Sequence, residues 1–313
     1  MDPDALDRTR KVISCNCGNC PGVDEDQNCP TSSCQDDLPV QCVDTWAEDK
    51  FSYFDRYLSA SWGARIKYAE KGNAVYIDLY SGPGISRIKN KNKEIYGGAL
   101  RAAKVPKAPF NKIILNDLSA KNCATIKSRI PDAEVYSRDA NDVVNDIIDK
   151  LILTDYKLHF CFVDPFAPKH LNFRTLTALA RLQKIDVMIN LPIGPIRRSY
   201  KTWLRTGGGK ILDDLLGTDE WRERLRKSPE ADFCNVLLDI FYKQLVLIGF
   251  SPTGLGILDE AGNEYKGPNI ATIKNSTNTS LYFLILASKN PLAAKLWKSI
   301  VNTSAKGQKN LFS

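Results

Sequence analysis

The chain has 313 residues, 43% of them hydrophobic, and a net charge of +7. It is long enough to bury a large core, and its average composition excludes a disulfide-stapled miniprotein and a wholly disordered chain. No apolar window approaches the ~18 residues that a membrane span requires. Residues 1–14 are polar and acidic, unlike a signal peptide, so we expect a cytoplasmic protein without membrane contact.

The first part of the chain differs in composition from the rest. Residues 1–45 contain three basic and nine acidic residues, whereas the remainder is basic. A basic body favours a nucleic acid or another polyanion as a partner, although an ordinary solvated surface has the same composition. Residues 1–43 are also poor in large apolar side chains, so they cannot form a core alone. We therefore divide the chain into a Cys-rich acidic arm, 1–43, and an α/β domain, 44–313.

Six of the nine cysteines lie in the first 42 residues. Cys15, Cys17 and Cys20 combine a CxC with a CxxC spacing, and Cys29 follows. Thiolates at these spacings can converge on zinc or an iron–sulfur cluster. Unpaired thiols in a flexible arm are the alternative. The arm is thus a candidate metal site with these four ligands.

After Asp44 the pattern becomes that of an α/β domain. Apolar residues at spacings of three to five predict an amphipathic helix over 46–66. Beyond Gly72, strands and helices alternate, and Ser119 is a candidate N-cap. The predicted strands are 74–80, 112–115, 133–136, 158–163 and 185–189; the predicted helices are 96–104, 119–129, 141–151 and 173–182. This alternation predicts a doubly wound, mostly parallel sheet.

The last third of the chain departs from this alternation. We expect a long helix over 231–248, a strand after Phe250 and a turn at 260–263. Strands at 270–274 and 280–287 are joined by a short turn, which predicts an antiparallel hairpin at one edge of the sheet. A helix over 290–301 closes the chain.

Each of the five predicted parallel strands delivers a polar side chain at or just beyond its end. These side chains are Asp78, Asp117, Asp139, Asp164 and Asn190. In an open α/β sheet, ligands bind beyond the carboxyl ends of the strands. An aspartate at a strand end is also a common helix cap, but five in succession favour a binding site. Asp117 is placed to bind ribose hydroxyls, and Asp139 to accept from an adenine amino group.

The loop after the first of these strands restricts the ligand. It contains Ser81-Gly82-Pro83-Gly84, in which two glycines allow a sharp turn and a close approach to a ligand. It lacks GxGxxG, which disfavours NAD, and it lacks the P-loop pattern GxxxxGK[ST]. The sequence therefore favours a nucleoside with a charged, non-phosphate tail.

The run from Asp78 to Gly84, DLYSGPG, resembles motif I of class I S-adenosylmethionine-dependent methyltransferases. The resemblance implies a Rossmann-like sheet of about seven strands and S-adenosylmethionine as methyl donor. It implies that the donor is held by Asp78, Tyr80, Ser81, Gly82, Gly84, Asp117 and Asp139. A methyltransferase is therefore the expected enzyme class.

Asp164-Pro165-Phe166 resembles the Asp/Asn-Pro-Pro-Tyr/Phe element that holds a target amine, but it is shorter by one proline. The resemblance implies that Asp164 accepts hydrogen bonds from the amine, Pro165 shapes the turn and Phe166 stacks on a base. Asn190 is expected to reach the same pocket as a substrate ligand. The function implied is methyl transfer to an amine, with an amine of a nucleic-acid base as one candidate.

A basic stretch that begins at Arg197 and Arg198 also contains Tyr200 and Trp203. Interleaved basic and aromatic residues can bind a single nucleic-acid strand, so both arginines are candidate substrate ligands. An exposed amphipathic helix has the same pattern. His170 is a conceivable base, or an ordinary surface histidine.

A narrower resemblance covers most of 44–302. Trp46, Lys50 and the segments 76–84, 162–166, 189–192 and 282–288 resemble the prokaryotic three-Cys-motif partner (TcmP) family. The resemblance implies a radical-enzyme-like protein with three cysteines as a partner. Two alternatives to an enzyme stay open. The chain could be a catalytically silent binding module that serves such a partner or an iron–sulfur protein, or it could be a nucleic-acid-binding protein.

Overall fold

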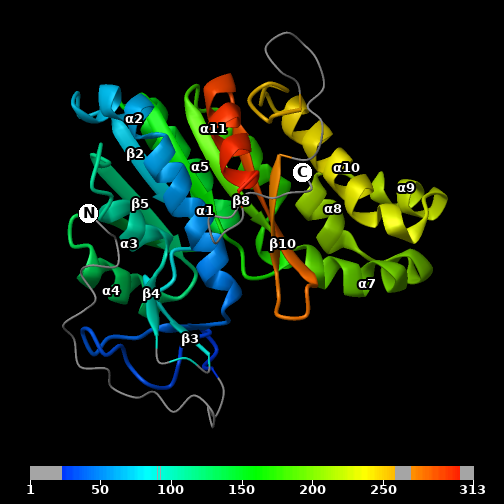
Figure 1. Cartoon of the computed structure of the whole chain (residues 1–313), viewed down its shortest axis with the longest axis horizontal. Coiled ribbons are helices and arrows are strands. Elements are labelled where there is room, and N and C mark those ends of the chain that lie inside the picture. The colour runs from blue at the N-terminus through cyan, green and yellow to red at the C-terminus, as the bar shows by residue number, and fades with distance from the viewer. Residues whose placement is uncertain (1–22, 90, 92, 258–268, 304–313) are drawn as a thin grey trace.

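A computed structural model describes residues 23–89, 91, 93–257 and 269–303 (Figure 1). Its main sheet has the strand order β6-β5-β2-β7-β8-β10-β9. The strands are β2 (Ala74–Asp78), β5 (Lys112–Asp117), β6 (Glu134–Ser137), β7 (Leu158–Val163), β8 (Ile185–Leu191), β9 (Ile270–Lys274) and β10 (Ser280–Ser288). β6, β5, β2, β7 and β8 are parallel, and β10 pairs antiparallel with both β8 and β9. The predicted Rossmann-like fold class is confirmed.

Helices cover both faces of this sheet, because alternate strand residues point to opposite sides. Val75 and Ile77 belong to one buried cluster, whereas Tyr76 belongs to the other. The first face is covered by α5 (Ala140–Ile152), α6 (Phe173–Leu179), α7 (Ile193–Thr206), α8 (Lys210–Leu216), α9 (Trp221–Lys227) and α10 (Phe233–Leu247). The second is covered by α1 (Trp46–Ala60), α3 (Gly98–Ala103), α4 (Ala120–Arg129) and α11 (Pro291–Val301). α2 (Trp62–Ala69) packs through Ala69 near the start of β2, and two short 3-10 helices, η3 (Pro168–His170) and η4 (Glu230–Asp232), complete the described elements.

A second, small sheet joins the arm to the domain. β1 (Gln41–Val43) pairs parallel with β3 (Ile85–Ile88), and β3 pairs antiparallel with β4 (Glu94–Tyr96). We call residues 23–43 the N-terminal strap. In Figure 1 it is the dark blue segment beside β3 and β4. The strap therefore lies on the body of the domain, next to the chain that follows the glycine loop.

Two local predictions were wrong. The predicted helix over 46–66 breaks at Ser61, whose hydroxyl contacts the carbonyl of Leu58 and accepts from Arg65. Such side-chain bonds to the nearby chain compete with a continuous helix. The strand expected after Phe250 is absent from 251–257, which forms turns. Gly254 there lies so close to the carbonyl of Ser288 that a Cβ would come within 1.8 Å of it. The turn predicted at 260–263 lies outside the described residues.

Within the described ranges, no helix is long and apolar enough to cross a membrane.

Candidate active site

The order of the parallel strands creates a switch point between β2 and β7. The chain runs from β2 outward to β5 and β6, and then returns to β7 on the other side of β2. Ligands of open α/β sheets bind at such a point, beyond the carboxyl ends of the strands. The structure has a cavity of about 30 Å³ there, and it is lined by five of the predicted site residues: Asp78, Tyr80, Ser81, Gly84 and Asp164. The strap contributes Gln41 and Val43 to the lining. A cavity of this volume holds about one water molecule.

The glycine loop has the backbone that the motif predicts. Gly82 and Gly84 have φ of +56° and +89°, in the left-handed region that favours glycine. A Cβ on Gly84 would come within 2.3 Å of Ile126 Cδ1 in α4. The N–H of Gly82 donates to Asp117 Oδ2 at 2.9 Å. The loop is therefore held between β2 and α4 with its backbone facing the cavity.

Asp117 connects the loop to the next helix. Besides Gly82 N–H, its carboxylate accepts from the backbone of Ser119 at 2.9 Å and from Asn122 Nδ2 at 3.2 Å. Burial raises the pKa of Asp117, although these three hydrogen bonds oppose the rise. Asp117 thus holds the loop in place, and it lies outside the cavity lining.

Asp78 lies at the bottom of the site and is only 2% exposed. The hydroxyl of Tyr76 donates to Oδ2 at 2.9 Å, and the N–H of Tyr80 donates to Oδ1 at 3.1 Å. Burial raises the pKa of Asp78 to about 7, and nearby Asp164 adds to the rise, whereas the two hydrogen bonds and Lys50 oppose it. The proton of this carboxyl group is therefore exchanged near neutral pH.

We expect Asp78 to make stability depend on pH. Because its pKa is raised from 3.8 to about 7, the folded protein binds this proton more tightly than the unfolded chain. Its contribution to stability is present below the unfolded pKa and is lost as the pH rises towards 7. Asp78→Asn should therefore flatten the decline in the free energy of unfolding across this window, measured by urea denaturation. Parallel pH profiles for the variant and the wild type would contradict the assignment.

Asp164, directly after β7, is at the centre of a cluster of three polar side chains, together with Asn190 and Lys50. Asn190 Nδ2, from the end of β8, donates to Asp164 Oδ1 at 2.7 Å. The ammonium of Lys50, from α1, forms an ion pair with Asp164 Oδ2. Oδ1 of Asn190 is buried and has no hydrogen-bond partner among the described residues. Asp164 and Asn190 therefore lie together at neighbouring strand ends, although Asn190 is not part of the cavity lining.

Lys50 was not predicted as a site residue. Its signal is a single charged residue within the apolar stripe of α1, where Trp46, Phe54 and Tyr57 share its face. A buried lysine on such a stripe requires a partner. The sequence alone does not show which carboxylate that partner is, because Asp164 lies on another element far along the chain.

Other predicted residues lie outside the cavity lining. Asp139 is exposed and caps α5, where its Oδ1 accepts from the backbone of Asn141 at 2.7 Å. Pro165 is buried next to Asp164. Phe166 is 57% exposed, and its ring centroid lies 6.4 Å from that of His170. Burial lowers the pKa of His170. The helix-cap alternative for Asp139 is therefore observed.

The two candidate arginines lie on α7, which begins directly after β8, and both are exposed. Arg197 Nη2 donates to the sulfur of Cys234 at 2.6 Å, and its guanidinium lies 5.4 Å from the ring centroid of Phe233. Arg197 therefore packs against α10, whereas the exposed Arg198 is near enough to Tyr282 to act on its pKa. Burial, together with Asp164, raises the pKa of Tyr282 to about 12, and Arg198 opposes the rise.

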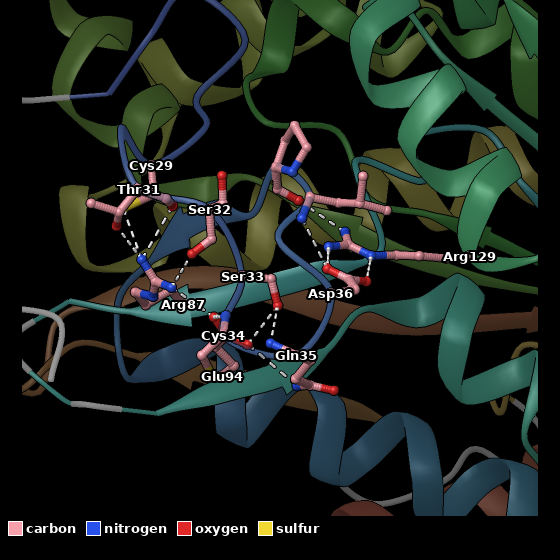
Figure 2. Close-up of polar contacts among 12 residues, drawn as sticks. Cys29, Thr31, Ser32, Ser33, Cys34, Gln35, Asp36, Arg87, Glu94 and Arg129 are labelled. Atoms are coloured by element: carbon pink, nitrogen blue, oxygen red, sulfur yellow. Dashed lines mark hydrogen bonds and ion pairs between the residues drawn. The ribbon is translucent and has the colours of Figure 1, made fainter. Parts of the chain in front are cut away.

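The strap is fixed to the domain by arginines (Figure 2). Arg87 of β3 donates to the carbonyls of Thr31 and Ser32, at 3.2 and 2.6 Å, and pairs with Glu94. Glu94 in turn accepts from the strap residues Ser33, Cys34 and Gln35. A second clamp is Arg129, the last residue of α4. It binds Asp36 and the carbonyls of Pro39 and Pro83.

Of the predicted metal ligands, Cys15, Cys17 and Cys20 lie outside the described residues. The sulfur of Cys29 is buried, 3.3 Å from the hydroxyl of Thr31 and 3.6 Å from Arg87 Nη1. The described part of the chain contains no group of three or more His, Cys, Asp or Glu residues that could hold a metal ion.

Comparisons with known proteins give distant structural likenesses. The plantazolicin methyltransferase BamL, in complex with a triazolic desmethylPZN analog and SAH, is 11% identical with a TM-score of 0.32, over 78% of this chain and 91% of that one. The StiE O-MT fragment, residues 961–1257, is 9% identical with a TM-score of 0.27, over 74% and 73%. No protein-family model and no curated protein matches the sequence, so the resemblance to the TcmP family is not confirmed. We transfer no residue role from these likenesses.

Proposed function

We propose that the chain is an S-adenosylmethionine-dependent methyltransferase that transfers a methyl group to an amine. The observation that carries the proposal is the cavity at the switch point, where the glycine loop after β2 meets the carboxylates of Asp78 and Asp164. The sheet has seven strands with an antiparallel pair at one edge, as the resemblance to class I methyltransferases implies.

The residues around the cavity fit a nucleoside donor with a zwitterionic tail. The glycine loop offers backbone without side chains, and Asp117 lies beside it for the ribose. Gly98 lines the cavity and packs tightly against its wall, because a Cβ there would come within 3.0 Å of Phe162, Tyr76 and Asp78. S-adenosylmethionine supplies an electrophilic methyl group when bound. Asp164 and Asn190 hold and orient the amine, and alignment of the two reactants supplies a large part of the rate acceleration.

A donor of this size enters only if part of the wall moves, because the cavity holds about one water molecule. The strap forms part of this wall and buries few apolar side chains. Among residues 23–43, the buried hydrophobic ones are Cys29 and Val40, and Arg87 and Arg129 hold the strap by polar contacts. Segments with few apolar contacts open at low free-energy cost, so we assign donor entry to strap opening.

The other partners stay predictions of the sequence. No contact among the described residues tests nucleic-acid binding by Arg197 and Arg198 on α7. None tests a radical-enzyme-like protein partner either. Zinc or an iron–sulfur cluster also stays a prediction, because Cys15, Cys17 and Cys20 lie outside the described residues; the fourth expected ligand, Cys29, contacts Thr31 and Arg87. Asp139 stays a proposed ligand of the adenine amino group, which it would bind while its carboxylate still caps α5.

The proposal is tested by calorimetric titration of the full chain with S-adenosylmethionine and S-adenosylhomocysteine. We expect binding by the wild type and weaker binding by Gly98→Ala, because the added Cβ displaces Asp78 and Phe162, which line the cavity; overpacking of this kind also costs ~1–3 kcal/mol of stability. Gly63→Ala is the matched control, since nothing lies within 4 Å of its Cβ position. Absence of binding by folded wild-type protein would refute the proposal.

A further inference from the structure

Lys50 lies inside the candidate active site, although it is on a helix of the outer layer. Its side chain is 7% exposed and lines the switch-point cavity. The ammonium pairs with Asp164 and lies 5.3, 4.7 and 5.9 Å from the ring centroids of Trp46, Phe51 and Phe162. Aromatic faces and a carboxylate are the groups that bind an alkylammonium ion.

We propose that Lys50 occupies the acceptor position of this site: the acceptor class is a primary alkylamine such as a lysine side chain, and Lys50 is itself methylated. The inference rests on the proposed function, since it requires a methyl donor at the same cavity. It replaces the nucleic-acid base, which the sequence suggested, by an aliphatic amine.

The walls of the site favour an alkylamine over a base. A planar base requires a flat slot and a stacking ring, but Phe166, the predicted stacking residue, is 57% exposed and lies beside His170. By contrast, the site already holds the four-carbon chain and ammonium of Lys50.

A second hydrogen-bond acceptor, Asn190 Oδ1, belongs to a residue that is bound to Asp164. Asn190 binds Asp164 through Nδ2, so its amide is fixed next to the ion pair. Its Oδ1 is buried without a partner in the described part of the chain. A buried oxygen of this kind is costly unless it receives a hydrogen bond. An amine held at Asp164 has N–H groups to donate to it.

The reaction needs the free amine, and the ion pair provides a route to it. A proton passes from the Lys50 ammonium to Asp164, which leaves a lone pair on Nζ. This pair forms the N–CH3 bond as the C–S bond of the sulfonium breaks, and the bonding electrons stay on sulfur in S-adenosylhomocysteine. The methylated nitrogen is again a cation that pairs with the carboxylate once Asp164 has released its proton to solvent.

The first experiment incubates the full chain with S-adenosylmethionine that carries a deuterated methyl group, followed by peptide mapping. We expect label on Lys50, no label in Lys50→Arg, and none on Lys89 or Lys121, whose side chains are exposed. Equal labelling of the exposed lysines would overturn the inference, because it would show unselective reaction.

The second experiment supplies the amine from outside. Lys50→Ala removes the built-in side chain, so it should methylate added n-butylamine, whereas the wild type, whose site is filled, should not. Calorimetry with S-adenosylmethionine on both proteins separates the two proposals. Donor binding without methylation of Lys50 or butylamine overturns this inference and leaves the proposed function standing. No donor binding by the folded wild type overturns both.

Discussion

Asp164→Ala is expected to destabilise the protein by about 3 kcal/mol or more and to abolish methyl transfer. The ion pair between Lys50 and Asp164 is largely buried, with side-chain exposures of 7% and 18%. Removal of one partner leaves an ammonium enclosed by aromatic rings, and breaking a buried pair in this way costs ~3–5 kcal/mol. The total stability of a domain is only ~5–15 kcal/mol, so urea denaturation will show the change clearly.

A double-mutant cycle separates the pair from its neighbours. Lys50→Met should cost less than Asp164→Ala, because Asp164 keeps the hydrogen bond from Asn190. The double variant Lys50→Met with Asp164→Leu removes both charges and should regain most of the stability, since apolar replacements of buried pairs are often neutral. Additive losses in the cycle would show that the two groups do not interact in solution.

The main sheet could be predicted because its signals are local. The strands at 158–163 and 270–274 have the predicted bounds; the first is a mostly apolar run buried on both faces, and the second alternates between buried and exposed residues. Ser119 is the predicted N-cap, and its hydroxyl accepts from the backbone of Asn122 at 3.2 Å. Period-2 burial and a cap need no knowledge of distant residues.

The small sheet and the strap could not be predicted because their signals are not local. β1 and β4 have three residues each, and β1 pairs with β3 across more than forty positions of sequence. The strap has an acidic, apolar-poor composition that alone indicates an unstructured arm. Its order comes from Arg87 and Arg129, two cations of the body whose partners the sequence does not specify.

The residues of the candidate site also divide into those with a local sequence signal and those without one. The strand-end rule places Asp78, Asp164 and Asn190 together, because parallel strands end at one edge of the sheet. It does not distinguish a ligand from a cap, so it treats Asp139 like the others. It also omits Lys50, which enters the site from a helix before the sheet begins.

Arg129→Ala is expected to free the strap and to increase exposure of the Cys29 thiol. The Arg129 side chain is 4% exposed, and its guanidinium donates hydrogen bonds of 2.8 Å to both oxygens of Asp36, 2.9 Å to the carbonyl of Pro39 and 2.5 Å to that of Pro83. It therefore ties the strap directly to the glycine loop. Unpaired carbonyls and a lost clamp cost ~1–3 kcal/mol, which corresponds to roughly tenfold or more in the opening equilibrium.

Thiol labelling followed by mass spectrometry measures this opening, because Cys29 is buried and the exposed Cys34 is an internal reference in the same strap. Labelling of Cys29 should accelerate in Arg129→Ala and change little in Arg174→Ala, whose pair with Asp142 lies on the surface.

S-adenosylhomocysteine should slow Cys29 labelling in the wild type, since a ligand that binds only under the closed strap stabilises the closed state. If Cys29 reacts as fast as Cys34 in the wild type, the strap does not close the site.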